Sequence, residues 1–363
     1  MRVGLPSART VVAVAGFILL CVVLLVLPQF ISDFRAQQFA YVGIYLIALV
    51  GLNILTGYTG QISLGHGAFM AIGGYTTAIL ISDQGLQFHG HVFMSDMKDV
   101  WTIPIAGLVA GLAGLLFAIP ALRLTGLYLA LATFAIAVAA PAVIKRFDTF
   151  TGGSGGVNMF GLPGLTGGID GVTIFGHHLT FNEWLYYLSW TIALIALAVA
   201  WFLLRGRTGR ALRAVRDSET AATSSGVNLA VYKTLAFGVS AAFAGVAGSL
   251  YAIANTFVNP DTFPITLSIF LLVGVVVGGL GSLAGLLAGA IFIYFMQISW
   301  AQNADKLIPD WLPWLGDLDT SSPGAPAVAF GVVLIAIMLV LPSGAAGLIR
   351  TVLALPARAR RAR

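Results

Sequence analysis

The longest charged interruption of this chain reads GRTGRALRAVRDSETAATSSGV, residues 206–227. Together with the preceding Arg205 it contains five arginines, although only 9% of the chain is charged. Apolar runs lie on both sides, Trp184–Leu204 before it and Thr234–Ala254 after it. Because clustered arginines need water while apolar runs of about 20 residues suit hydrocarbon, the contrast predicts a hydrophilic loop between two membrane-spanning helices.

The composition of the whole chain supports this prediction. Of its 363 residues 58% are hydrophobic, and the mean hydropathy is +0.94, whereas a soluble domain has roughly 45–50% apolar residues. Such a chain lacks the polar surface to cover a water-soluble core, but a helix bundle can face lipid. We therefore predict an all-α polytopic membrane protein. The single Cys21 allows no intramolecular disulfide and leaves the compartment open.

Apolar runs long enough to cross about 30 Å of hydrocarbon recur along the chain. We predict about ten transmembrane or re-entrant helical segments within one domain, residues 1–363. The first is expected to be an uncleaved span, because no small-x-small cleavage site follows it. The segments are Val11–Phe30, Phe39–Leu55, Ile62–Ile81, Trp101–Leu122, Leu127–Ile144, Trp184–Leu204, Thr234–Ala254, Ile265–Gly279, Leu283–Trp300 and Ala327–Ile349.

Charge predicts the orientation of these segments, since basic residues near span ends favour the cytoplasmic side. With the N-terminus inside and the spans alternating, 14 of the 19 basic residues fall on inner segments. Only Asp217 and Glu219 of the 14 acidic residues do so. We therefore predict cytoplasmic N- and C-termini, with a basic tail at 350–363. For the tail to lie inside, the stretch Ile265–Trp300 must begin and end on the same side of the membrane. It can do so as two crossings or as one re-entrant hairpin.

Residues 205–233 are then the largest cytoplasmic loop. No proline or glycine occurs between Arg210 and Ser225 and alanine recurs, so we predict a short helix closed by Gly226 as a C-terminal cap. A helix face of small residues lets another protein approach its backbone, which favours docking. The arginines also have a simpler interpretation, as topology determinants and anchors to lipid phosphates.

A second polar stretch, GYTGQISLGHGAFMAIGGY at residues 57–75, places Gln61, Ser63, Gly65 and His66 near the start of a span. Polar, glycine-interrupted backbone is costly against lipid, so it should face a cavity or another helix. It could form a discontinuous helix that lines a substrate path or flexes during gating. Alternatively, the glycines permit close packing while the polar groups bond to neighbouring backbone. We favour packing for His66 alone and the pathway for the segment as a whole.

Other glycines predict packing or turns rather than chemistry. G-x-x-x-G spacings near the C-terminal third place small residues on one helix face, for packing within the chain or against a partner. TGGSGGV, residues 151–157, lacks the Lys-Ser/Thr of a phosphate-binding loop and falls outside, and no other stretch matches that motif. No His, Cys or carboxylate cluster has metal-ligand spacing. We predict no cofactor, no metal and no catalytic residue. The spaced glycines are Gly274, Gly278, Gly281, Gly285 and Gly289.

Several stretches are similar, in this order, to the signatures of one family. They are GYTGQISLGHGAFMAIGGY, LRLTGLYLALATFA, FTGGSGGV, RTGRALRAVRDSETAATSSGVNLAVYKTLAFGVSAAFAGVAGSLYA and NPDTFPITLSIFLLVGVVVGGLGSLAGLLAGA. The chain resembles the permease subunits of bacterial branched-chain amino acid ABC importers, from about Asn53 to Ala290, with a family-like close at LPSGAAGLI.

In such permeases the cytoplasmic loop carries a coupling motif, E-A-A-x-x-x-G. In this chain the alanine and glycine positions are filled, Thr220 stands where the glutamate is expected, and Glu219 lies one residue earlier. The resemblance implies that this loop docks the ATPase subunits. The residues assigned to coupling are Arg213, Arg216, Glu219, Ala221, Ala222 and Gly226.

The resemblance also implies the function and the partners. It implies a bacterial inner-membrane permease subunit that moves leucine, isoleucine or valine, delivered by an external solute-binding protein. Two ATP-binding subunits and a second homologous permease would complete the assembly in membrane lipid, with no nucleic acid involved. Related permeases move urea and short amides, so that substrate class is the alternative.

Three other classes of protein are less consistent with the residues. A proton- or sodium-coupled transporter usually carries ionisable groups within its spans, and these spans have essentially none. A facilitative channel is possible, but it does not explain a docking helix. An intramembrane enzyme would need a nucleophile and a base, for which only Ser63 and His66 offer themselves.

Overall fold

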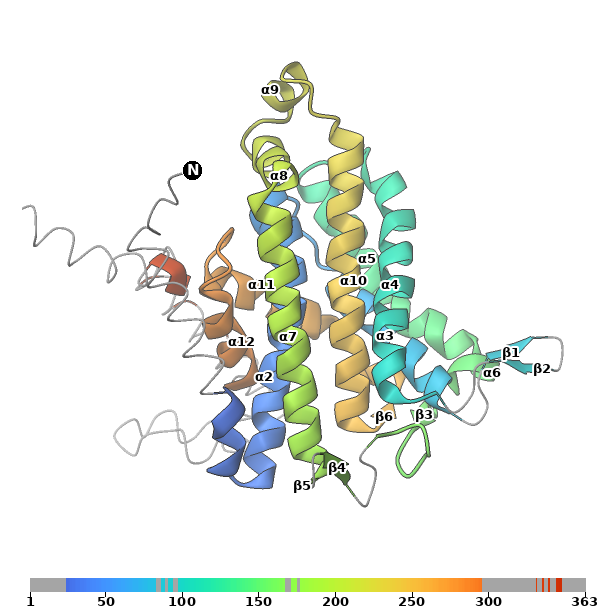
Figure 1. Ribbon diagram of the computed structural model, residues 1–363. Coiled ribbons are helices and arrows are strands. Elements are labelled where there is room, and N and C mark those ends of the chain that lie inside the picture. Colours follow the sequence, from blue (N-terminus) through green and yellow to red (C-terminus); the bar gives the residue numbers. More distant parts are fainter. Residues whose placement is uncertain are drawn as a thin grey trace, which may run out of the picture.

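A computed structural model describes residues 24–82, 86–88, 91–93, 97–166, 171–174, 177–295, 331, 335, 339 and 344–347. They form an elongated helix bundle with small two-stranded sheets at one end (Figure 1). Within these described ranges, six helical segments are long and apolar enough to cross a membrane: Asp33–Tyr58, Asp99–Ala121, Leu127–Arg146, Phe181–Arg205, Leu229–Asn255 and Pro260–Gly278. The polytopic helical class is therefore confirmed. Most of the predicted first and tenth spans, and the basic tail, lie outside the described residues.

Helix α2, Asp33–Leu52, is the core of the bundle. It continues without a break into a π-helical turn, η2, Asn53–Tyr58. In the apolar part of Asp33–Tyr58, 94% of the residues are buried. The helices that pack around it are α7 (Phe181–Arg205), α10 (Leu229–Asn255) and α12 (Leu286–Tyr294). The helices Asp99–Ala121, Leu127–Arg146 and Phe181–Arg205 keep many large hydrophobic side chains exposed, as expected for helices that face lipid.

Helix α10 packs closely against α3, His66–Ile81, and α4, Asp99–Ala121. Glycines allow this approach: a Cβ atom at Gly73 of α3 would overlap the backbone of Gly245 on α10. A Cβ atom at Gly248 would likewise overlap the backbone of Met70. Small residues at helix crossings are the usual means of packing in membranes, where the hydrophobic effect does not drive helices together.

The late glycines pack within the chain. Helix α11, Ile265–Gly278, and α12 are joined by a turn at 279–285, and Cβ atoms at Gly285 and Gly289 would overlap the backbone of α11. Of the two packing interpretations, the intramolecular one is therefore confirmed. Helix α11 with the preceding η3, Pro260–Thr262, is longer than the predicted eighth span. Residues 296–300, the end of the predicted ninth span, lie outside the described residues.

Charged residues sort to the two ends of the bundle. The helices α8, Arg207–Asp217, and α9, Glu219–Ser224, cap the end drawn uppermost in Figure 1. The opposite end holds the short helix α6, Asp148–Thr151, and two strand pairs. Strand β3, Val157–Asn158, pairs with β6, Phe257–Val258, and strand β4, Val172–Ile174, pairs with β5, His177–Leu179. Strands β1, Leu86–Phe88, and β2, His91–Phe93, form a third antiparallel pair, and η1 spans Leu27–Gln29. Acidic residues on the elements at the sheet end are Asp33, Asp99, Asp148, Glu183 and Asp261.

This sorting leads to a test of orientation. In a Cys21→Ser background, we expect a cysteine at Ser225, exposed beside α9, to be protected from a membrane-impermeant thiol reagent in intact cells. A cysteine at Thr173, exposed on β4, should be labelled. The physical reason is the retention of clustered arginines on the cytoplasmic side. Labelling of both cysteines from outside would contradict the prediction that the two ends of the bundle lie on opposite sides of the membrane.

Candidate functional site

The arginine-rich loop folds as two helices, so the prediction of one helix over Arg210–Ser225 is wrong in this respect. The break lies at Ser218, whose backbone is extended. Its Oγ accepts a hydrogen bond from the Ala221 amide at 3.3 Å and so caps α9. The predicted C-terminal cap is confirmed: Gly226 adopts a φ of +82°, and its amide donates to the Thr223 carbonyl at 2.9 Å.

Helix α8 lies with its apolar side on the bundle. Gly209, Ala211, Leu212 and Val215 are buried, and a Cβ atom at Gly209 would overlap the backbone at the end of α7. The arginines occupy the exposed side, which satisfies their need for water. They are Arg207, Arg210, Arg213 and Arg216.

Helix α9 is anchored to α10 by an ion pair. Glu219 Oε1 lies 2.7 Å from Lys233 Nζ, and the lysine side chain is only 8% exposed. Because a nearly buried ammonium group needs a partner, this pair holds the start of α9 against the bundle. Glu219 thus contacts its own chain.

The two alanines of the coupling motif face opposite ways. Ala222 is 2% exposed and packs against its own chain, whereas Ala221 is exposed. Ala222, although assigned to coupling, therefore does not lie on the outward surface of α9. Thr220, Ser224 and Ser225 are exposed together with Ala221, and we call these four residues the α9 face.

Two arginines of α8 bond to backbone carbonyls. Arg213 donates to the carbonyls of Gly209, at 3.0 Å, and Leu204, at 3.2 Å, and so closes the junction of α7 and α8. Arg216 reaches a different element, because its Nη1 donates to the Gly57 carbonyl in η2.

The other candidate region is the polar segment, residues 59–66. Residues 60–65 are non-helical, and α3 begins at His66, four residues later than the predicted span. Gln61 is 8% exposed, and Ser63 and His66 are fully buried. The segment therefore faces other helices, as expected for polar backbone within an apolar bundle.

Hydroxyl groups satisfy the backbone amides of this segment. The Leu64 amide donates to Thr133 Oγ1 of α5, Leu127–Arg146, at 2.9 Å. The Gly67 amide donates to Ser268 Oγ of α11 at 2.8 Å, and the Gly65 amide to Ser63 Oγ at 3.3 Å. These bonds tie the start of α3 to two neighbouring helices. Thr133 and Ser268 were not predicted as site residues, because a lone hydroxyl in an apolar run carries no sequence signal.

His66 is held by α10. Its Nε2 lies 3.3 Å from Ser240 Oγ, which itself donates to the Gly51 carbonyl at 2.7 Å. His66 Nδ1 and Gln61 Nε2 have no hydrogen-bond partner within the described part of the chain. The imidazole is therefore bonded to Ser240 and not to Ser63, which argues against a Ser63–His66 nucleophile and base.

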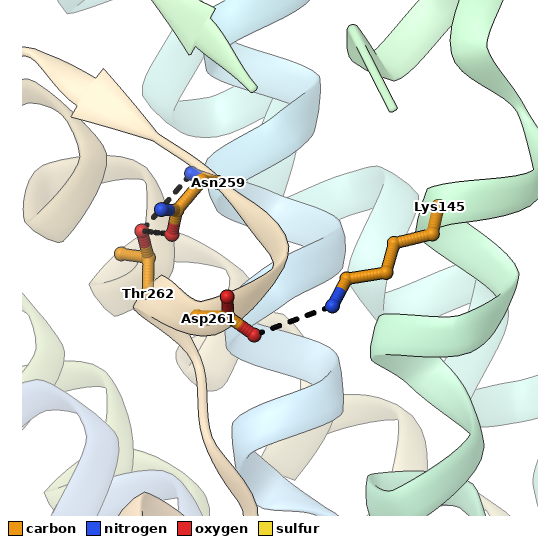
Figure 2. Close-up of polar contacts among 4 residues, drawn as sticks. All are labelled: Lys145, Asn259, Asp261 and Thr262. Carbon is orange, nitrogen blue, oxygen red and sulfur yellow. Dashed lines mark hydrogen bonds and ion pairs between the residues drawn. The ribbon is translucent and has the colours of Figure 1, made fainter. Parts of the chain in front are cut away.

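Helix α5 covers the polar segment but packs lightly. Only 22% of the residues in its most apolar window are buried. Beyond the Thr133 contact, Lys145 Nζ lies 3.5 Å from Asp261 Oδ1 of η3, in a loop shaped by hydrogen bonds between Asn259 and Thr262 (Figure 2). Both side chains of the pair are well exposed, and such pairs contribute about 0–1 kcal/mol.

These features define a class: a multi-pass helical membrane protein with a polar, interrupted helix in its interior and a cationic helix pair at one end. Comparison with known sequences gives the family. The profile of the branched-chain amino acid transport system permease component matches residues 35–352. The chain therefore belongs to this permease family.

Individual relatives agree with the family. The chain is similar to the high-affinity branched-chain amino acid transport system permease protein LivM of Escherichia coli K12, with 37% identity over 69% of this chain and 60% of the relative. It is also similar to LivH of Escherichia coli K12, with 25% identity over 84% of this chain and 91% of the relative. The chain thus spans about 60% of the length of the LivM relatives from Escherichia coli and Salmonella typhimurium. No solved structure matches the chain.

Proposed function

We propose that the chain is a permease subunit of an ATP-driven ABC importer in the bacterial inner membrane. It translocates branched-chain amino acids that an external solute-binding protein delivers. The relatives LivM and LivH are both named permease proteins of a high-affinity branched-chain amino acid transport system, which supports branched-chain amino acids as the substrate class and a second homologous permease as a partner.

The observation that carries the proposal is the cationic helix pair α8–α9. Its outward α9 face is made of small and hydroxyl side chains, while the Glu219–Lys233 pair and buried Ala222 hold it on the bundle. A surface of this kind suits the docking of two soluble ATP-binding subunits. The chain contains no G-x-x-x-x-G-K-[ST] motif, so the energy comes from those partners.

The polar segment is the part of the chain that we expect to line the path of the substrate. Gln61, Ser63, Gly65 and His66 interrupt the helical path between η2 and α3, and their neighbours on α5 and α11 bond to the same backbone. Interrupted helices build the substrate sites of many transporters. Movement of the lightly packed α5 would open this segment to a zwitterionic substrate.

Reconstitution tests the proposal. Co-expression of the chain with two ATP-binding subunits, a second permease and a binding protein should give ATP-dependent uptake of leucine, isoleucine and valine, but not of urea or acetamide. The chain alone should neither hydrolyse ATP nor transport. Saturable, ATP-independent uptake by the chain alone would indicate a facilitator instead, and uptake of the amides would reassign the substrate class.

A further inference from the structure

Arg216 connects three elements that are distant in the sequence. Its Nη1 donates to the carbonyl of Gly57, in the π-helical turn that ends α2. Its side chain lies over Gly60, where a Cβ atom would be 3.3 Å from Arg216 Cγ. A Cβ atom at Gly281, in the turn between α11 and α12, would lie 2.9 Å from the same Nη1.

The Gly57 carbonyl is a suitable acceptor for a fixed cation. The last carbonyls of a helix lack an intrahelical partner, and the helix dipole makes that end negative. The Arg216 guanidinium supplies both the hydrogen-bond donor that this carbonyl lacks and a positive charge at the negative end of the helix. A hydrogen bond from a guanidinium is also stronger than one between neutral groups. Positive φ angles at Gly60, +73°, and Gly281, +75°, let the backbone pass closely around the side chain.

The elements around this contact are themselves bonded together. Asn53 of η2, fully buried, accepts from the Gly281 amide at 2.9 Å and donates to the Ser282 carbonyl at 3.3 Å. Thr56 Oγ1 donates to the Gln61 carbonyl at 3.1 Å, and the Gln61 amide to the Leu55 carbonyl at 3.2 Å. The π-helical turn and the beginning of the polar segment therefore form one hydrogen-bonded unit.

We propose that Arg216 is a positioning residue that links the helix pair α8–α9 to the polar segment, and that this contact is kept throughout the transport cycle. Displacement of α8 by the docked ATP-binding subunits is then carried through Gly57 into Gln61 and Ser63, and through Gly281 into the α11–α12 turn. This inference deepens the proposed function and depends on it.

The first test measures the coupling ratio of the reconstituted complex, which is the substrate transported per ATP hydrolysed. In Arg216→Gln we expect the ATP-binding subunits to remain bound and to hydrolyse ATP. The substrate transported per ATP should fall about tenfold, because loss of a charge-assisted hydrogen bond produces a change of about this size. Arg216→Lys should recover part of the ratio, because an ammonium group keeps the charge but lacks the planar fork. Arg210→Gln, an exposed arginine of the same helix, should leave the ratio unchanged.

A second test replaces the contact by a covalent bond. A Cβ atom at Gly60 would lie 3.8 Å from Arg216 Cβ, a separation that suits a disulfide. In a Cys21→Ser background, the pair Gly60→Cys and Arg216→Cys should be uncoupled when reduced and regain coupling when oxidised. Gly60→Cys alone measures the strain of a side chain at positive φ.

The outcomes separate the two proposals. An unchanged ratio in Arg216→Gln, or an oxidised pair that hydrolyses ATP but no longer transports, would overturn the link. If Arg216→Gln does not reach the membrane, the oxidised and reduced forms of the cysteine pair decide. Failure of the native complex to couple ATP hydrolysis to uptake would contradict the proposed function itself.

Discussion

Replacement of Ala221 by glutamate should release the ATP-binding subunits and abolish uptake. Ala221 lies exposed at the centre of the α9 face, so the substitution leaves the fold of the free permease intact. In the docked complex, however, it buries a carboxylate without a partner. An uncompensated buried charge costs about 3–5 kcal/mol, which weakens binding more than roughly a hundredfold. The measurement is the ATPase retained on the permease after purification in detergent, alongside uptake in cells.

Two variants control this experiment. Arg207→Gln removes one of several cytoplasmic charges and should leave both assembly and uptake close to native. Ala222→Glu should also fail, but for another reason: Ala222 is buried in its own chain, so the charge would displace α9 and lower the thermal stability of the permease alone. Full ATPase retention in Ala221→Glu would mean that α8–α9 is only a topological anchor.

The second large effect is expected at Gly65. A Cβ atom there would lie 3.1 Å from the Thr133 carbonyl oxygen and 3.4 Å from Thr133 Cβ, so Gly65→Leu must push α5 away from the polar segment. Overpacking of this kind costs about 1–3 kcal/mol, and we expect uptake to fall at least about tenfold. Uptake is compared at equal amounts of permease in the membrane.

His66→Gln is the matched control at the next position. The glutamine amide can still bond to Ser240, so uptake should be affected less than in Gly65→Leu. If His66→Gln abolishes uptake at a normal membrane level while Gly65→Leu does not, an imidazole-specific role must replace the packing account. Gly65→Ala, which adds a single methyl group at the same contact, should be intermediate.

The polytopic helical class could be predicted from the sequence because hydropathy is a local property. Each apolar run of about 20 residues must satisfy its backbone internally in lipid, so it becomes a helix whatever its neighbours are. The cap at Gly226 is local in the same sense, since the left-handed conformation favours glycine. The polar segment was also recognisable, because Gln61, Ser63 and His66 interrupt an otherwise apolar sequence.

Which surface each residue faces was decided only by the tertiary structure. Ala221 and Ala222 are equally small, yet packing on the bundle buries one and leaves the other exposed. Arg216 was assigned to coupling together with Arg213, but only the folding of α8 beside the end of α2 brings it to Gly57. The sequence by itself determined that the apolar segments are helical and which segments are charged, because these properties follow from neighbouring residues. The contacts that join the helix pair to the polar segment connect residues about 160 positions apart, and such pairings are a property of the packed bundle alone.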